Sequence, residues 1–301
     1  MNTKGIDCFN AFLMLTLILF WGCSFVVVKI ALKEGLTPIA IATFRFLIAG
    51  GLFIIAILIE KKRKNYKLLV KKEELPTLLF LALTGVTFFF TAQYTGIQMA
   101  GASIAAILVC LLSPIIISAL SVIMLNEHFV RKQVLGFGIA ALGTFIIVTG
   151  GTIHSSSSGD FLLGSLILLS TPILWATYSL IGKKIIERYS PFLVAVYVNA
   201  LGGLCLIPFS LAERSLSQIF TTSLNGLLAI LFLAVTCSLL GYYIWLHVMK
   251  QVGAAITSSF LFAEPLVTAL FATIFVGEEL GVFIPAGAFL IFMGVYLVTR
   301  K

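Results

Sequence analysis

Residues 114–143, PIIISALSVIMLNEHFVRKQVLGFGIAALG, and residues 265–294, PLVTALFATIFVGEELGVFIPAGAFLIFMG, follow one pattern at a constant offset of 151 positions. Four landmark residues recur at this offset: Pro114 with Pro265, Glu127 with Glu278, Gly136 with Gly287, and Gly143 with Gly294. Such agreement without a gap indicates a duplication inside one gene. The sequence therefore predicts two related halves, residues 1–150 and 161–301, joined by an external serine-rich linker at residues 151–160.

The composition of both halves is that of a membrane protein. Hydrophobic residues make up 60% of the 301 residues, charged residues make up 11%, and the mean hydropathy is +1.13, which is more than a soluble core requires. A helix needs roughly 20 apolar residues to cross the hydrocarbon layer of a bilayer. Ten stretches meet this requirement: Phe9–Leu32, Ile39–Ile59, Leu75–Gln98, Ala102–Leu125, Val134–Gly150, Phe161–Lys183, Pro191–Leu211, Leu224–Met249, Ala254–Val276 and Val282–Val298.

The basic residues predict how these helices are oriented. Sixteen of the twenty Lys and Arg residues lie on one side of a ten-helix topology, in short segments around residues 4, 61–72, 131–132, 183–188, 250 and 300–301. Because cytoplasmic loops accumulate positive charge, we expect both termini in the cytoplasm and the protein in the plasma (inner) membrane. Since each half has an odd number of helices, the halves are expected to be antiparallel. The net charge of +8 then reflects topology and attraction to anionic lipid, and no nucleic-acid partner is predicted.

The sequence contains no motif for catalysis or for a cofactor. Its five cysteines lack paired spacing and its three histidines lie far apart, so neither a disulfide framework nor a metal site is predicted. It has no phosphate-binding loop, metalloprotease helix or nucleophile elbow. The longest polar stretch, residues 60–74, leaves no room for a soluble domain. We therefore expect neither an enzyme nor an ATP-driven pump, and an intramembrane enzyme or a structural membrane protein is a weaker alternative.

An antiparallel duplication of membrane helices favours a secondary transporter. In such proteins two inverted repeats enclose a site near the middle of the bilayer, and exchanging the conformations of the repeats exposes that site to alternate sides. The expected partners are therefore a small-molecule substrate and the lipid bilayer.

The start of each half carries a further shared pattern. FWGCSFVVVK holds Trp21 and Lys29, and LWATYSLIGKK holds Trp175 and Lys183 at the matching places. With the repeated stretches quoted above, these motifs resemble the drug/metabolite transporter superfamily, and more narrowly its ten-helix metabolite-exporter (EamA-type) branch, over essentially the whole chain. The resemblance implies export of small amphipathic metabolites such as amino acids, with proton coupling as one option. Metabolite uptake and uncoupled facilitation are the alternatives.

Two charged residues fall inside predicted membrane helices. Glu264 lies near the middle of the ninth stretch, where a lone carboxylate costs roughly 2.5 to 3.5 kcal/mol on insertion scales. It is expected either to bind a coupling proton or cation or to form a buried ion pair, for example with Arg45 in the second stretch. Arg45 could instead bind a substrate carboxylate or phosphate, and the second half has no basic counterpart near Asn199.

Helical spacing also indicates residues that could line a cavity. Amphipathic rings and amides are the side chains expected around an amphipathic substrate. The candidates for substrate binding are Trp21, Tyr94, Gln98, Trp175, Tyr178, Asn199 and Tyr243.

Prolines and glycines are expected to shape the helices. Pro114 and Pro265 fall at equivalent midpoints of the fourth and ninth stretches, where a missing N–H can provide a hinge or a static kink. The repeated glycines of the fifth and tenth stretches allow close helix packing, either within one chain or across a homodimer. Glu127 and Glu278 lie just beyond helix ends, where capping or a structural role near a gate is expected. Lys183 is expected to extend its charged end to the cytoplasmic interface.

Overall fold

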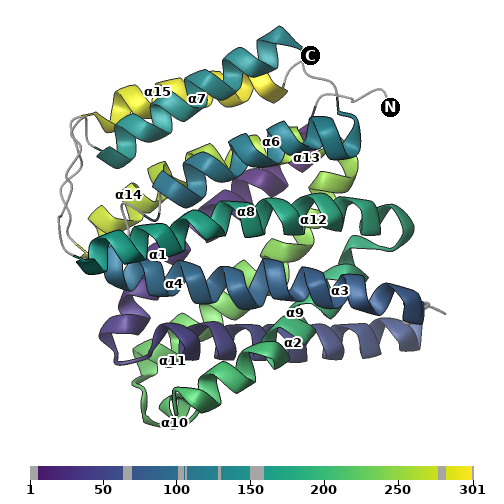
Figure 1. Ribbon diagram of the computed structural model, residues 1–301, viewed down its shortest axis with the longest axis vertical. Helices are drawn as coiled ribbons and strands as arrows, with labels where there is room; N and C mark the ends of the chain where they lie inside the picture. The colour runs from purple at the N-terminus through teal and green to yellow at the C-terminus, as the bar shows by residue number, and fades with distance from the viewer. Residues whose placement is uncertain are drawn as a thin grey trace.

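Every regular element is helical in the part of the chain that the structure, a computed structural model, describes (Figure 1). That part comprises residues 6–63, 70–100, 105, 107–127, 130–149, 159–276 and 283–299. The first half contains α1 (Cys8–Lys33), α2 (Pro38–Arg63), η1 (Lys72–Glu74), α3 (Leu75–Ala82), η2 (Leu83–Thr87), α4 (Phe88–Ala100), η3 (Ile107–Leu111), α6 (Leu112–Leu125) and α7 (Arg131–Thr149). The second half contains α8 (Gly159–Arg188), α9 (Pro191–Ala212), α10 (Gln218–Thr221), α11 (Leu224–Phe232), η4 (Leu233–Leu240), α12 (Gly241–Val252), α13 (Ala254–Ser259), η5 (Phe260–Ala263), α14 (Glu264–Val276) and α15 (Ile284–Thr299).

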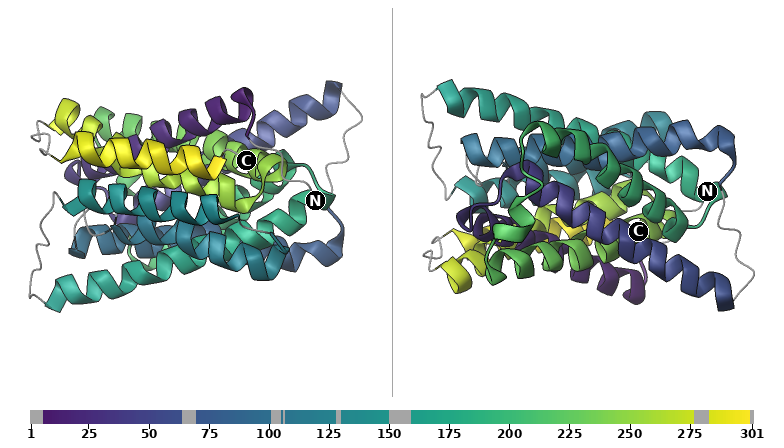
Figure 2. Two further views of the ribbon diagram at one scale, coloured as in Figure 1. Left: turned by 90° about the horizontal axis from the view of Figure 1, so that it is seen from above. Right: turned by 90° about the horizontal axis from the view of Figure 1, so that it is seen from below.

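Long apolar helices dominate the described residues. Eight helical stretches among them are long and apolar enough to cross a membrane, and α15 is a shorter apolar helix. Large apolar side chains cover the outside of the bundle, and Ile123, Ile274 and Phe289 are 76%, 72% and 67% exposed. Such a surface suits lipid and not water. The helices run along a common direction, and α1 begins at the end of the bundle where α15 ends (Figure 2). The protein is therefore a multi-pass membrane protein.

Four of the predicted stretches are not continuous α-helices in the described residues, and the π-helical segment η3 interrupts one of them, Ala102–Leu125. The π-helical segments η2 and η4 interrupt the stretches Leu75–Gln98 and Leu224–Met249 at equivalent places in the two halves. The 3₁₀ segment η5 interrupts the stretch Ala254–Val276. Hydropathy predicts how long an apolar segment is, but it does not distinguish i→i+4 from i→i+5 or i→i+3 hydrogen bonds. Single π turns inside helices are frequent at functional sites.

The helices α7 and α15 pack closely through their repeated glycines. A Cβ atom added to Gly136 would lie 2.7 Å from the carbonyl oxygen of Gly294, and one added to Gly143 would lie 2.6 Å from that of Gly287. Residue numbers rise along one helix as they fall along the other, so these repeat-equivalent helices are antiparallel. Of the two arrangements expected for these glycines, the structure has the contact within one chain. A homodimer through another surface stays a prediction.

The helices α2 and α9 form a second antiparallel pair of equivalent helices. Gly50 lies against Ala200, and Gly203 lies against the backbone of Phe46 and Leu47. On either side of this pair the contacts match: α1 packs on α14 and α12 as α8 packs on α6 and α4. The two halves thus interlock, and side chains from both of them enclose the centre of the bundle.

Candidate functional site

A buried pocket lies between the two halves. Its cavity volume is about 50 Å³. Its polar and charged lining residues are Ser24, Arg45, Gln93, Cys110, Ser113 and Glu264, and its apolar and aromatic lining residues are Trp21, Phe25, Phe89, Phe90, Val109, Trp175, Tyr242 and Leu261. These side chains come from α1, α2, α4, η3, α6, α8, α12, η5 and α14. Because the lining comes from both halves, relative motion of the halves would reshape it.

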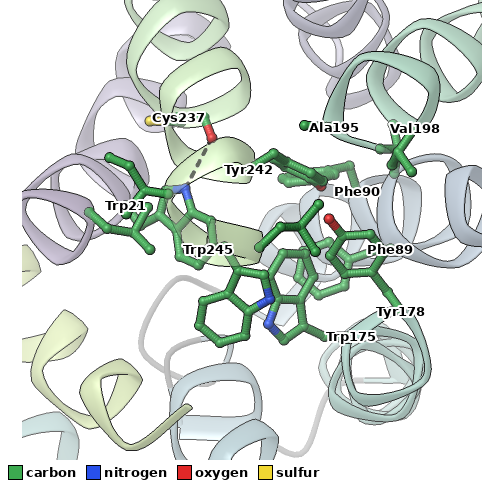
Figure 3. Packing of buried hydrophobic residues seen from close by; sticks show 14 of the residues in the cluster. Trp21, Phe89, Phe90, Trp175, Tyr178, Ala195, Val198, Cys237, Tyr242 and Trp245 are labelled. Carbon is green, nitrogen blue, oxygen red and sulfur yellow. Dashed lines mark hydrogen bonds between the residues drawn. The ribbon is translucent and has the colours of Figure 1, made fainter. Parts of the chain in front are cut away.

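Three tryptophans, Trp21, Trp175 and Trp245, pack together (Figure 3), and Trp21 and Trp175 also line the pocket. The ring centroids of Trp21 and Trp175 are 5.4 Å apart, and Trp245 lies 5.5 Å from each of them. The Trp21 indole donates a hydrogen bond of 3.1 Å to the carbonyl oxygen of Cys237. This bond satisfies the one polar atom of Trp21 and fixes its ring.

Arg45 brings a buried positive charge to the pocket. Its side chain is 2% exposed, Nε donates to Ser238 Oγ at 2.9 Å, and Nη1 donates to the Tyr94 hydroxyl at 2.5 Å. The guanidinium carbon also lies 4.4 Å from the centre of the Phe90 ring, a cation–π contact. No ion pair joins Arg45 to a carboxylate of the residues that the structure describes. The ion pair with Glu264, one of the options from sequence, is therefore not formed, although both residues line the pocket.

Glu264 is the first residue of α14 and is 5% exposed. Oε2 accepts a hydrogen bond of 3.2 Å from the Cys110 thiol. Oε1 is buried and has no hydrogen-bond partner in the described part of the chain. The positive end of a helix dipole favours a carboxylate at this position, but an unpartnered buried oxygen is costly. Glu264 is therefore poised to accept a hydrogen bond from something that enters the pocket.

The prolines lie inside the apolar spans Leu108–Leu125 and Ala254–Phe275, at points where the type of helix changes. Pro265 is the second residue of α14, directly after η5, and Pro114 is the third residue of α6, directly after η3. In the first turn of a helix the missing N–H has no intrahelical acceptor to lose. Each proline therefore lies in the first turn of an α-helical segment beside the pocket. A hinge at these junctions stays a prediction.

Two charged residues hold the turn between α12 and α13. Glu127 accepts hydrogen bonds from the backbone N–H groups of Ala254 (2.8 Å) and Ala255 (3.2 Å), so its expected capping role is confirmed. Lys183 Nζ donates to the carbonyl oxygens of Met249 (2.6 Å) and Lys250 (3.3 Å) at the end of α12. The expectation that Lys183 extends freely to the interface is wrong, because it is 9% exposed and caps a helix. Glu278 lies outside the described residues.

The structure brings together only some of the residues proposed for substrate binding. Trp21 and Trp175 line the pocket, and Tyr94 reaches it through its bond to Arg45. The other four lie outside the lining: Tyr178 packs behind Trp175, Asn199 donates to the carbonyl of Ala195 (2.8 Å), Gln98 is exposed, and Tyr243 packs against Phe192 and His247. Helical spacing places residues on a common face, but it does not say which face meets the pocket.

Their neighbours take these places. Gln93 and Tyr242 line the pocket instead of Gln98 and Tyr243. Cys110 and Ser113 also line it and were not predicted. A signal for Ser113 was present, because it stands at the repeat position of Glu264, each directly before its proline.

Comparisons with known proteins agree with this fold. The model of the EamA-like transporter family matches the chain twice, over residues 9–149 and 162–300. An uncharacterized transporter of Archaeoglobus fulgidus is 31% identical over 301 residues, which covers 100% of this chain and 99% of that protein. A probable amino-acid metabolite efflux pump of Salmonella typhimurium is 26% identical over 299 residues, covering 96% of this chain and 94% of the pump.

A solved crystal structure of a protein that is 16% identical superposes with a TM-score of 0.76, covering 97% of this chain and 96% of the other. At this identity the likeness concerns the fold alone. The double match of the family model spans nearly the whole chain and coincides with two interlocking helical halves around one pocket. The chain therefore belongs to the EamA-like transporter family.

Proposed function

We propose that this transporter is a secondary-active exporter that works by alternating access and moves small amphipathic metabolites, such as amino acids, out of the cytoplasm. The observation that carries the proposal is the pocket between the halves, which holds an aromatic wall, a buried cation and a buried carboxyl group. The proposal includes ten membrane-crossing helices in two inverted halves, a plasma-membrane location and cytoplasmic termini. The antiparallel packing of equivalent helices, α7 with α15 and α2 with α9, supports the inversion.

Polar contacts between the halves lie at both ends of α2 and supply two possible gates. At its amino end, Glu34 accepts a hydrogen bond from Ser223 Oγ (2.6 Å), and Thr37 donates to Glu213 (2.6 Å). Beyond its other end, Glu74 forms an ion pair with Arg188, and the backbone N–H of Lys71 donates to the Tyr189 hydroxyl at 3.3 Å. Each contact joins the first half to the second. In alternating access one set opens while the other stays closed.

The size of the pocket agrees with such a cycle. A cavity of about 50 Å³ is much smaller than the pockets of roughly 300–1,000 Å³ that hold small molecules, so the walls would separate to admit a metabolite. The walls contain the junctions at Pro114 and Pro265, where the helical segments are already interrupted. Motion at these junctions would open the pocket without breaking a continuous helix.

We further propose that Glu264 couples export to proton entry. A lone carboxylate inside a membrane is costly and is commonly part of a proton or ion pathway. In this pocket the group contacts a thiol and has one bare oxygen, and no cation of the described residues is paired with it. Uptake and release of a proton by the Glu264 carboxyl group would change the charge of the pocket at the lowest cost in free energy. The naming of the Salmonella relative as a probable amino-acid metabolite efflux pump agrees with an exporter.

Transport in proteoliposomes tests this function. Labelled amino acids, nucleosides and cationic dyes are supplied with and without an imposed proton gradient, and wild type is compared with Glu264→Gln. Glu73→Gln is the matched control, because it removes a carboxylate that is exposed and distant from the pocket lining. We expect at least one substrate to move, with the gradient accelerating wild type and Glu73→Gln but not Glu264→Gln. If the flux is equal in the three proteins and does not change with the proton gradient, the protein is an uncoupled facilitator. If no substrate moves, the transport proposal is refuted.

A further inference from the structure

The π-helical segments η2 and η4 begin in one repeated sequence pattern. FLALTG (residues 80–85) and FLAVTC (residues 232–237) match at an offset of 152 positions. In each pattern the threonine hydroxyl donates a hydrogen bond to the carbonyl oxygen of the phenylalanine four residues earlier, at 2.8 Å in the first and 2.7 Å in the second. Such a bond competes with the backbone hydrogen bonds of a helix and often bends it. The same local interruption is therefore built into both halves.

The last residue of each pattern accepts a hydrogen bond from the opposite half. The carbonyl oxygen of Cys237, in the second half, accepts from the Trp21 indole at 3.1 Å. The carbonyl oxygen of Gly85, in the first half, accepts from the Tyr242 hydroxyl at 2.5 Å. Trp21 and Tyr242 both line the pocket. Backbone carbonyls of η2 and η4 thus hold pocket side chains across the boundary between the halves.

Arg45 is held in the same way by the residue that follows Cys237. Its Nε donates to Ser238 Oγ, in the second half, whereas its bond to Tyr94 stays within the first half. Ser238 and Cys237 are both 0% exposed. A buried donor that loses its acceptor costs free energy. Separation of the halves must therefore give these donors new acceptors or admit water to them.

The segment η2 also fits tightly against the second half. A Cβ atom added to Gly202, in α9, would lie 2.5 Å from Cβ of Val86 in η2, and one added to Gly85 would overlap the ring of Tyr178 in α8. Packed segments of this kind move between discrete arrangements and do not deform continuously. A shift of the second half therefore has to carry η2 with it or change its conformation.

Taking the proposed alternating access as given, we infer that η2 and η4 are moving parts of the transport cycle: they hold Trp21, Arg45 and Tyr242 across the halves while the pocket is closed, and they release them when it opens. A π segment bonds i→i+5. Its return to i→i+4 bonding turns the residues beyond it about the helix axis and withdraws the carbonyl from its partner. Gly85, Cys237 and Ser238 are then positioning residues for the pocket lining.

The labelling rate of Cys110 measures how often the pocket opens. Cys110 lines the pocket and is 1% exposed, so maleimide should reach it only in an open state. The protein is the full-length chain in detergent with Cys110 as its single cysteine. Cys237 is replaced by serine, which keeps the backbone carbonyl oxygen that Trp21 binds.

Two tyrosine variants give a matched comparison. Tyr242→Phe removes only the hydroxyl that binds Gly85, and Tyr243→Phe makes the same change one residue further on, outside the pocket lining. Loss of one net hydrogen bond shifts an equilibrium by about 2- to 10-fold. We expect Cys110 labelling to be faster by about that factor in Tyr242→Phe and unchanged in Tyr243→Phe. Equal labelling of Tyr242→Phe and wild type, or the same acceleration in both variants, overturns the inference.

A serine series separates a positioning bond from a general loosening of the bundle. Ser238→Ala removes the hydroxyl that accepts from Arg45, and Ser238→Thr keeps it. We expect labelling of Cys110 to rise about 2- to 10-fold in Ser238→Ala and to return toward the wild-type rate in Ser238→Thr. Acceleration of the same size in both variants contradicts a role for the hydroxyl.

Hydrogen exchange of the wild type decides without any variant. If η2 and η4 rearrange when the pocket opens, their amides exchange through that local opening and are less protected than those of the continuous helix α9. Protection equal to that of α9 overturns the inference. Flux in proteoliposomes tests the transport function separately. Flux together with a negative result in these experiments refutes only the role of η2 and η4, whereas absence of all flux refutes the transport function itself.

Discussion

Gly136→Ala and Gly138→Ala make the same chemical change two residues apart on α7, and the structure predicts different outcomes for them. A Cβ atom at Gly136 would lie 2.7 Å from the carbonyl oxygen of Gly294 and 2.9 Å from Cγ2 of Val298, both in α15. Ordinary contact begins at 3.4 Å, so the helices would have to separate by about 0.7 Å. A Cβ atom at Gly138 would meet nothing within 4 Å.

The comparison isolates the cost of that separation. Both variants gain the same helix propensity, up to about 1 kcal/mol, so this contribution cancels between them. Overpacking a tight contact typically costs about 1–3 kcal/mol. We therefore expect Gly136→Ala to be less stable than Gly138→Ala by about that amount, with Gly138→Ala as stable as wild type or slightly more so.

Unfolding of the purified proteins in mixed micelles with increasing dodecyl sulfate, followed by circular dichroism, measures this difference. Wild type and both variants are compared at one detergent composition. Equal unfolding midpoints for the two variants would refute the antiparallel glycine contact between α7 and α15, and with it one support for the inverted arrangement.

Three further predictions follow from the site and its surroundings. All three tryptophans of the chain lie within one cluster. The tryptophan fluorescence should therefore change when a transported substrate binds, and brominated lipids should quench this fluorescence only weakly. Strong quenching would place the cluster on the lipid surface. Glu127→Ala removes both acceptors that cap α13 and should cost about 0.5–2 kcal/mol of stability. Glu127→Gln should cost less because it keeps one acceptor oxygen. Thermal unfolding compares the two variants, and equal losses of stability would argue against the cap. In single-cysteine variants, maleimide should modify the exposed Cys8 rapidly, whereas Cys110, which is 1% exposed, should react only when the pocket opens. Mass spectrometry measures both labelling rates, and equal rates would contradict a closed pocket.

The sequence alone determined the class of the protein and most of its helices. Hydropathy is a local property, and a segment must be long and apolar to satisfy its backbone inside lipid. For this reason α1, α2 and α9 begin and end within a few residues of the predicted stretches. The repeat and the motifs around Trp21 and Trp175 predicted the family, which the family match confirms. They also predicted two residues of the pocket wall.

Only the tertiary structure decided which side chains meet in the pocket. Successive residues of an α-helix point about 100° apart, so a rotation of that size exchanges Tyr243 for its neighbour Tyr242 in the pocket lining. That rotation is set by contacts between residues far apart in sequence, such as Arg45 with Ser238 and Cys110 with Glu264. The same long-range packing left Arg45 and Glu264 unpaired in one cavity, where the sequence had allowed an ion pair. Contacts that span from 49 positions, as between Arg45 and Tyr94, to 193, as between Arg45 and Ser238, set the chemistry of this site, and hydropathy within one helix does not predict them.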